Sequence, residues 1–234
     1  MAEIKVFSTG AVEPMVKMFA PVFERDTGHK ANLIFGTAGG IRGRLEAGEQ
    51  PDLLILPAAD MEAMDKAGKL APGTRTDLGR TITGIAIKDG AAAPDVSTPE
   101  AFKQALIKAK GVSFSDPAAG GSSGTYFAGL LQKMGIADAV NKKAVLGKRG
   151  YEVAQAVVDG RVEIGTTFIS ELLTVPGVRI LGPLPGELYF ANTYTAGIPV
   201  GSAQRDAATA LLRVLTNPQT RDRWTAAGLE PAFP

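Results

Sequence analysis

Cysteine is absent from this 234-residue chain, and histidine occurs once, at His29. Without cysteine there are no disulfides, no thiolate nucleophile and no cysteine-bound zinc. A single histidine argues against a histidine-rich metal centre and against a conventional Ser-His-Asp triad. We therefore expect no metal site, no cofactor and no side chain in a conventional catalytic role.

The chain also has no large excess of charge of either sign and no long apolar run. Lys and Arg number 25 against 24 Asp and Glu, a net charge of +1 that provides no field to attract nucleic acid or an anionic membrane. No apolar run approaches the roughly 20 residues of a bilayer span. We expect neither nucleic acid binding nor stable membrane insertion. The chain enters a strand pattern at once, so it is either cytoplasmic or has lost a leader peptide.

The composition that is present can build a packed core. Hydrophobic residues make up 45% of the chain and glycine occurs 28 times, which suits neither a disordered nor a fibrous protein. One large or two small domains are expected, because a single core stops growing beyond roughly 250 residues.

Short apolar strands alternate with amphipathic helices in the first part of the chain. Strands are predicted at 5–7, 33–35 and 52–56, and helices at 12–23 and 41–47. Within the first helix, Pro14 suits the opening turn, whereas Pro21 is expected to kink the helix or split it in two.

The same order of elements restarts after residue 98, where Thr98 and Pro99 predict a capped helix start. Later strands are predicted at 112–114, 144–146, 162–167 and 178–181, and helices at 126–134, 151–158, 203–215 and 218–227, the last capped by Asn217. The repetition predicts two α/β lobes, each a mostly parallel sheet flanked by helices. We expect lobe 1 at 1–82 plus 195–234, lobe 2 at 83–194, and hinge strands near 82–88 and 191–197.

The turns that follow the strands share small and hydroxyl-bearing residues. Ligands of open parallel sheets bind at the carboxyl ends of the strands. Glycine lets the backbone approach a ligand closely, while helix starts and Ser or Thr hydroxyls supply hydrogen-bond donors for an anion. Turn and capping chemistry explains any one such turn, but its recurrence in both lobes favours an anion site in a cleft between them. The turn residues concerned are Ser8, Thr9, Gly10, Ala11, Thr37, Ala38, Gly39, Ser122, Ser123, Gly124, Thr125 and Phe168.

Two arginines beside these turns are candidates to clamp a carboxylate, namely Arg42 and Arg149. Arg44 and Lys148 are expected on solvated helix faces. His29 is expected at the surface in a turn, and Trp224 is expected to anchor the last helix to lobe 1.

Several segments together resemble the type II periplasmic solute-binding proteins, in the branch related to the molybdate-binding proteins of ABC transporters. The similar segments are VFSTGA (6–11), FERDTG (23–28), FGTAG (35–39), LEAG (45–48), PDLLI (51–55), DP (116–117) and LLQKMG (130–135). The resemblance covers nearly the whole chain, and its specificity lies in their order and spacing. It implies the two-lobed type II periplasmic-binding-protein fold, hinge closure on a small anionic ligand, and delivery to an ABC transporter membrane permease. It also implies a periplasmic location with the leader peptide removed; we expect a monomer, since closure requires free lobes.

By position, the resemblance places the ligand-contacting loops at Thr9 to Ala11, Thr37 to Gly39, Ser122 to Thr125, Gly150 with Tyr151, and Phe168, with Arg149 adjacent. Ala11 stands where the family has a ligand serine, and Phe168 lacks the hydroxyl of the family's tyrosine. The Gly-Gly-Ser-Ser-Gly loop is also longer than the molybdate form. These departures favour an organic di- or tricarboxylate held by backbone donors and arginine.

Two classes of function stay open at this point. The leading hypothesis is a receptor without chemistry. The alternative is an isomerase of a small polycarboxylate on the same scaffold, because the resemblance extends to aconitate isomerase and fold does not fix function. Such an enzyme needs a base near an acidified C–H bond, and the candidates are Tyr126, Tyr151, Glu152 and Lys148.

Overall fold

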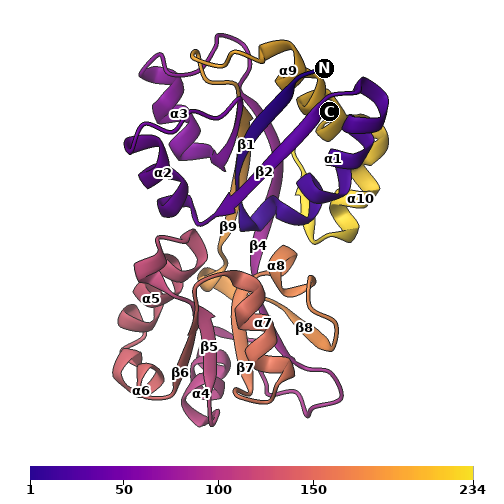
Figure 1. Ribbon diagram of the computed structural model, residues 1–234. Coiled ribbons are helices and arrows are strands. Elements are labelled where there is room, and N and C mark those ends of the chain that lie inside the picture. Colours follow the sequence, from indigo (N-terminus) through magenta and orange to yellow (C-terminus); the bar gives the residue numbers. More distant parts are fainter. Residues whose placement is uncertain (234) are drawn as a thin grey trace. The chain divides into compact units, whose positions relative to one another are not determined.

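The computed structural model describes residues 1–233, and the chain forms two compact units. Unit 1 contains Met1–Thr81 and Asn192–Pro234, and unit 2 contains Ile82–Ala191. The chain passes from one unit to the other inside strand β4 (Thr76–Lys88) and returns at the start of strand β9 (Ala191–Gly197), as the ribbon in Figure 1 shows.

The sheet of unit 1 has a parallel core. Strand β1 (Glu3–Thr9) pairs in parallel with β2 (Lys30–Gly36) on one side and β3 (Leu53–Pro57) on the other. Antiparallel strands extend it, since β9 pairs with β3 and the short β10 (Leu229–Pro231) pairs with the start of β4. Every residue of β3 is buried, which agrees with the apolar pattern of a strand covered on both faces.

Helices flank this sheet. In chain order they are η1 (Gly10–Val12), α1 (Glu13–Thr27), α2 (Ala38–Glu46), α3 (Ala58–Lys66), α9 (Arg205–Leu215), η4 (Pro218–Thr220) and α10 (Arg221–Ala226). Of the two outcomes expected for Pro21, a kink or a split, the split is wrong, because α1 is one helix with Pro21 inside it. Pro21 is exposed, so water can satisfy the carbonyl that its ring leaves unpaired. The buried side chains Met15, Phe19 and Phe23 hold the opposite face of the helix against the unit.

Trp224 anchors the end of the chain to unit 1, as predicted. It is fully buried, and its Nε1 donates to the carbonyl of Leu215 at 3.2 Å. A Cβ added at Gly79 would lie 2.9 Å from the indole ring, so β4 needs glycine at the point where Trp224 packs. The predicted last helix is a 3-10 turn followed by α10, and Asn217 caps the turn by accepting from the Gln219 N–H at 3.0 Å.

The sheet of unit 2 repeats the parallel core. Strand β5 (Val112–Ser115) lies between β6 (Ala144–Gly147) and β7 (Ile164–Phe168), with both pairs parallel. The second half of β4 pairs antiparallel with β7 and with β8 (Val178–Pro183). In both units, therefore, three parallel strands form the core predicted from the sequence, and the strands that connect the units add antiparallel pairs.

The helices of unit 2 cover the two faces of this sheet. They are α4 (Pro99–Lys108), η2 (Pro117–Ala119), α5 (Ser122–Lys133), α6 (Ala137–Asn141), α7 (Gly150–Val158), α8 (Ile169–Leu172) and η3 (Gly186–Leu188). The predicted cap of α4 is confirmed, since Thr98 Oγ1 accepts from the Ala101 N–H at 3.1 Å. The core includes Phe114, whose ring centroid lies 5.1 Å from that of Phe127.

Candidate functional site

In unit 1, two of the predicted ligand turns lie side by side. Thr9 at the end of β1 pairs in register with Gly36 at the end of β2, so the turn beginning at Gly10 adjoins the turn beginning at Thr37. Helices η1 and α2 start directly after these strands. The backbone N–H groups of two helix starts therefore lie at the carboxyl edge of the sheet.

Thr9 carries a buried hydroxyl at this edge. The residue is 3% exposed, and among residues 1–233 its Oγ1 has no hydrogen-bond partner. The neighbouring Ser8 is fully buried, and its Oγ donates to the Thr9 carbonyl over a long 3.4 Å. A buried hydroxyl without a partner costs about 1–3 kcal/mol, which makes Thr9 a position where a ligand acceptor would be favourable.

The second turn of unit 1 is committed to helix capping. Thr37 Oγ1 accepts from the Gly40 N–H at 3.0 Å and so caps α2. Ala38 is buried, as is Ala11 in the first turn, and neither has a hydroxyl to offer. The Thr9 hydroxyl and backbone N–H groups are thus among the donors that this edge provides.

In unit 2, helices α5 and α7 begin at the carboxyl edge of the parallel strands. Ser115 at the end of β5 pairs with Gly147 at the end of β6. The N-cap residues of the two helices are Gly121 and Arg149, and neither uses its own side chain to cap its helix. A Cβ at Gly124 would lie 2.3 Å from the Ser115 carbonyl oxygen, so glycine allows the first turn of α5 to rest on the end of β5.

Three buried hydroxyls meet at this edge, and we call Ser115, Ser123 and Thr167 the hydroxyl cluster. Thr167 Oγ1 lies 3.0 Å from Ser115 Oγ and 3.2 Å from Ser123 Oγ, and the two serine oxygens are 3.3 Å apart. Thr167 Oγ1 also donates to Glu171 Oε2 at 2.9 Å. Of the predicted site residues, Ser123 is therefore the one that belongs to the cluster.

Sequence reasoning missed Glu171, which the fold brings to the start of α7. A Cβ built on Gly150 would lie 2.1 Å from Glu171 Oε2, so the carboxylate occupies the space that a side chain at 150 would fill. Helix α8 is too short to show a period. The place of Glu171 as the third residue of α8 would favour a contact with the start of α8 itself, and no signal in the sequence pointed to α7.

The other predicted residues of unit 2 play several roles. Thr125 is exposed, and its hydroxyl donates to the Gly121 carbonyl at 3.0 Å. Tyr151 is also exposed, and the Arg149 guanidinium carbon lies 5.7 Å from its ring centroid. Phe168 is 2% exposed and stacks on Phe190 at 6.2 Å, while Ser122 at the start of α5 is half-buried.

Several charged or titratable candidates make contacts within their own unit. Arg42 is 2.8 Å from Asp60 and Arg44 is 3.0 Å from Glu49. Glu152 Oε2 accepts from the Lys148 N–H at 2.9 Å, next to the start of α7.

Tyr126 is likewise part of the packing of unit 2. Its hydroxyl donates to the Leu188 carbonyl at 3.1 Å, and its ring stacks on Phe190 at 4.1 Å. Burial raises the pKa of the Tyr126 hydroxyl. A raised pKa makes Tyr126 a weaker candidate for a base at neutral pH, because the ionised form becomes rarer.

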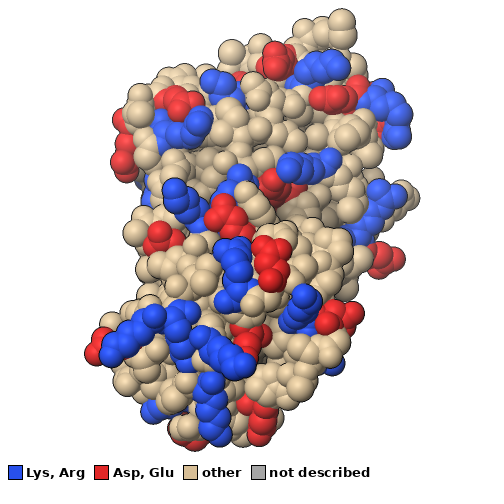
Figure 2. Space-filling model, turned by 60° about the horizontal axis from the view of Figure 1, so that its bottom comes forward, with Lys and Arg blue, Asp and Glu red and all other residues tan. Residues whose placement is uncertain are grey.

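On the face shown in Figure 2, several Lys and Arg side chains adjoin one another at the lower left, and elsewhere Lys and Arg are interspersed with Asp and Glu. Ion pairs within helices include Lys17 with Glu13 (2.6 Å) and Lys66 with Glu62 (2.6 Å).

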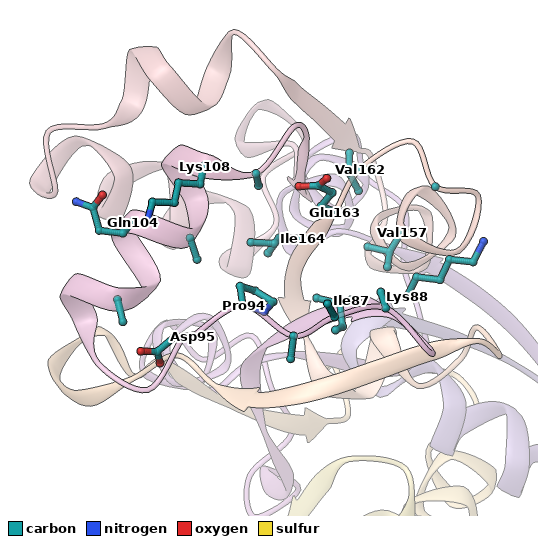
Figure 3. A pocket seen from close by; sticks show the side chains of 17 residues that line it. Ile87, Lys88, Pro94, Asp95, Gln104, Lys108, Val157, Val162, Glu163 and Ile164 are labelled. Carbon is teal, nitrogen blue, oxygen red and sulfur yellow. The ribbon is translucent and has the colours of Figure 1, made fainter.

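A cavity of about 780 Å³ lies elsewhere in unit 2 (Figure 3), lined by apolar side chains such as Ile87, Val157 and Ile164. Charged side chains, among them Lys108 and Glu163, also line it. It lies at the start of β7, whereas the predicted site residues lie at the end of that strand. A second cavity of about 510 Å³ in unit 1 includes Arg42 but no predicted turn residue. Neither cavity contains the candidate anion site.

Two α/β units, each with helix starts collected at the carboxyl edge of a parallel core, define the class of two-lobed solute-binding proteins. The sequence pattern of the bacterial extracellular solute-binding proteins matches residues 4–230, and the chain belongs to that family. The chain is 30% identical over 234 residues to an aconitate isomerase of Pseudomonas sp, covering 97% of this chain and 87% of the relative. It is 28% identical over 238 residues to the molybdate-binding protein ModA of Azotobacter vinelandii, covering 97% and 89%.

Solved structures confirm the type II fold expected from the resemblance. The periplasmic molybdate-binding protein of Azotobacter vinelandii matches with a TM-score of 0.75 at 18% identity, over 99% of each chain. Within the described residues, no helix combines the length and the apolar character needed to cross a bilayer.

Proposed function

We propose that this protein is a periplasmic receptor that captures a small anion, an organic di- or tricarboxylate or an oxyanion, and presents it to the membrane permease of an ABC transporter. The proposed contacts are the predicted turn residues of both units together with Arg149, Gly150 and Tyr151. We further propose a monomer whose units close on the ligand about β4 and β9, with the leader peptide removed from the mature protein.

The observation that carries the proposal is the Thr9 hydroxyl, buried at the edge of β1 with no partner among the described residues. A hydrogen bond from this hydroxyl to a charged ligand would contribute about 1.5–3 kcal/mol. Each helix start nearby would contribute roughly 0.3–1 kcal/mol toward a negative charge. Such contacts would supply part of the roughly 8 kcal/mol to which micromolar binding corresponds.

Two further observations support an organic anion within this class. Ala11 and Phe168 stand at proposed contact positions without a hydroxyl, so side-chain donors are fewer than a tetrahedral oxyanion would use. An aconitate isomerase, which acts on a tricarboxylate, is among the relatives at 30% identity.

Calorimetric titration of the protein against molybdate, tungstate, sulfate, citrate, aconitate and malate tests the proposal. Micromolar binding of at least one anion is expected. Substitutions in either unit, at Thr9 or at Tyr151, should weaken the same binding event. Silence across the whole panel would refute an anion receptor.

A second candidate, an isomerase of a small polycarboxylate, is favoured by the similarity to aconitate isomerase and by the Glu171 carboxylate at the start of α7. Isomerisation needs a base that removes a proton from carbon, and a carboxylate can serve. Incubation with cis- or trans-aconitate, followed by ultraviolet absorbance, separates the two functions. Turnover that Glu171→Gln abolishes would establish the enzyme, whereas binding without turnover supports the receptor.

A further inference from the structure

We infer that Glu171 and the hydroxyl cluster provide hydrogen-bond acceptors at the carboxyl edge of unit 2, so that the ligand is a hydroxy acid rather than a fully ionised tetrahedral oxyanion. This inference rests on the proposed function and specifies its ligand class. It follows from the number of hydrogens that the cluster contains and from where each of them points.

The direction of the hydrogen bonds begins at the carboxylate. An ionised glutamate only accepts, and each hydroxyl has a single hydrogen to donate. Thr167 gives its hydrogen to Glu171 Oε2 at 2.9 Å. Thr167 must then accept in its 3.0 Å contact with Ser115, which makes Ser115 the donor of that bond.

Ser123 completes the chain of donors. Its Oγ lies 3.3 Å from Ser115 Oγ, toward which it donates, and 3.2 Å from Thr167 Oγ1. In either geometry the Ser123 hydrogen points into the cluster. All three hydroxyl hydrogens are therefore directed toward Glu171, and the lone pairs of Ser123 are what the cluster offers to a ligand.

The position of Glu171 brings a negative charge to the same place. Its carboxylate lies against Gly150, with Oε2 2.1 Å from the position of a Cβ there, at the first residue of α7. Molybdate and sulfate are ionised and offer only acceptor oxygens, so in this position they would face a like charge and further acceptors.

A hydroxy acid suits both kinds of group at this edge of unit 2. Its carboxylates can accept from backbone N–H groups at the starts of α5 and α7, while its own hydroxyl donates to Glu171 or Ser123. A carboxylate has lone-pair sites for several donors, so Glu171 can receive the ligand hydroxyl while it keeps the bond from Thr167. The ligand hydroxyl thus becomes a determinant of specificity.

The test uses pairs of acids that differ by one hydroxyl, malate against succinate and citrate against tricarballylate, with sulfate and molybdate alongside. Calorimetric titration of the wild-type protein should show the hydroxylated member of a pair binding at least about tenfold more tightly, with both oxyanions weaker. Glu171→Gln removes the charge at nearly constant shape and should reduce the preference to under about threefold. Glu163→Gln is the matched control, because Glu163 lies at the other end of β7 and accepts from the Lys110 N–H at 2.9 Å.

The outcomes separate the inference from the function. Equal binding of malate and succinate, and of citrate and tricarballylate, or preference for sulfate or molybdate, would overturn the inference while an anion receptor still stands. No detectable binding of any acid or oxyanion would overturn both the inference and the proposed function. If Glu171→Gln does not fold, Gly150→Ala gives a second route, because its methyl group must displace the Glu171 carboxylate and should reduce the same preference.

Discussion

Replacing Thr9 with valine should raise the stability of the protein and lower its affinity for the ligand. The Thr9 hydroxyl is buried and lacks a partner among the described residues. Leaving a hydroxyl unpaired in the interior costs about 1–3 kcal/mol, and valine removes that cost at nearly the same shape. We therefore expect the free energy of unfolding to rise by about 1 kcal/mol in the absence of ligand.

Affinity should move in the opposite direction. If the hydroxyl donates to a charged ligand, its loss removes about 1.5–3 kcal/mol, which corresponds to roughly a tenfold to hundredfold rise in Kd. Urea unfolding without ligand and calorimetric titration with the best-binding acid measure the two quantities on the same preparation.

Thr166→Val is the matched control. Thr166 is 1% exposed on β7, and its Oγ1 likewise has no partner within residues 1–233. It pairs with Ile85 and Phe114, and it lies outside the proposed contacts. The stability of this variant should rise in the same way while its affinity stays within about twofold of the wild type. Unchanged affinity in Thr9→Val, or an equal loss in Thr166→Val, would refute the assignment of Thr9.

Further predictions follow from packing and titration. Gly124→Ala should destabilise the protein by about 1–3 kcal/mol in urea unfolding, because the new Cβ would meet the Ser115 backbone at 2.3 Å. Gly129→Ala on the same helix has open space and should stabilise it by about 0.5–1 kcal/mol; loss of stability there would contradict the packing argument. Trp224→Ala should cost about 3–5 kcal/mol, and a cost near zero would show that the indole does not anchor unit 1. Tyr126→Phe should cost about 0.5–1.5 kcal/mol at pH 7 through the lost bond to Leu188. Burial raises the pKa of the Tyr126 hydroxyl, so this group contributes its full stability below the unfolded pKa near 10 and loses it as pH rises through the folded pKa. The free energies of unfolding of wild type and Tyr126→Phe should therefore converge above about pH 10. A difference in stability that stays constant with pH would refute this.

The sequence was most informative where local chemistry decides the structure. The run Leu53–Leu56 predicts a strand covered on both faces, and all of β3 is buried. Thr98 and Pro99 predict a helix start, and Thr98 caps α4. Pro21 shows the limit of the local rule, because the buried face of α1 and the exposure of the proline ring outweigh one missing hydrogen bond.

Local sequence patterns did not predict contacts between residues that lie far apart in the chain. Arg42 was a candidate clamp for a carboxylate, yet it pairs with Asp60 in α3, a helix that no pattern had indicated. The roles of Thr167 and Glu171 depend on the approach of α8 to the start of α7, a contact that Gly150 permits and that no spacing in the sequence reveals. The short β10 was missed for a similar reason, since its pairing with β4 joins residues far apart in the chain.

Glycine and hydroxyl residues at a strand end do not by themselves distinguish a binding turn from a packing turn. Gly124 is required by the Ser115 backbone and Gly150 by the Glu171 carboxylate, so both glycines have reasons to be present that need no ligand. What distinguishes the turns is whether their hydroxyl hydrogens already have an acceptor within the protein. Thr9 has a donor without an acceptor, whereas the hydroxyl cluster has already directed its donors to Glu171. A ligand at the edge of unit 2 must therefore donate a hydrogen bond to the cluster while its charged groups accept from the helix starts, and a carboxylic acid bearing a hydroxyl does both.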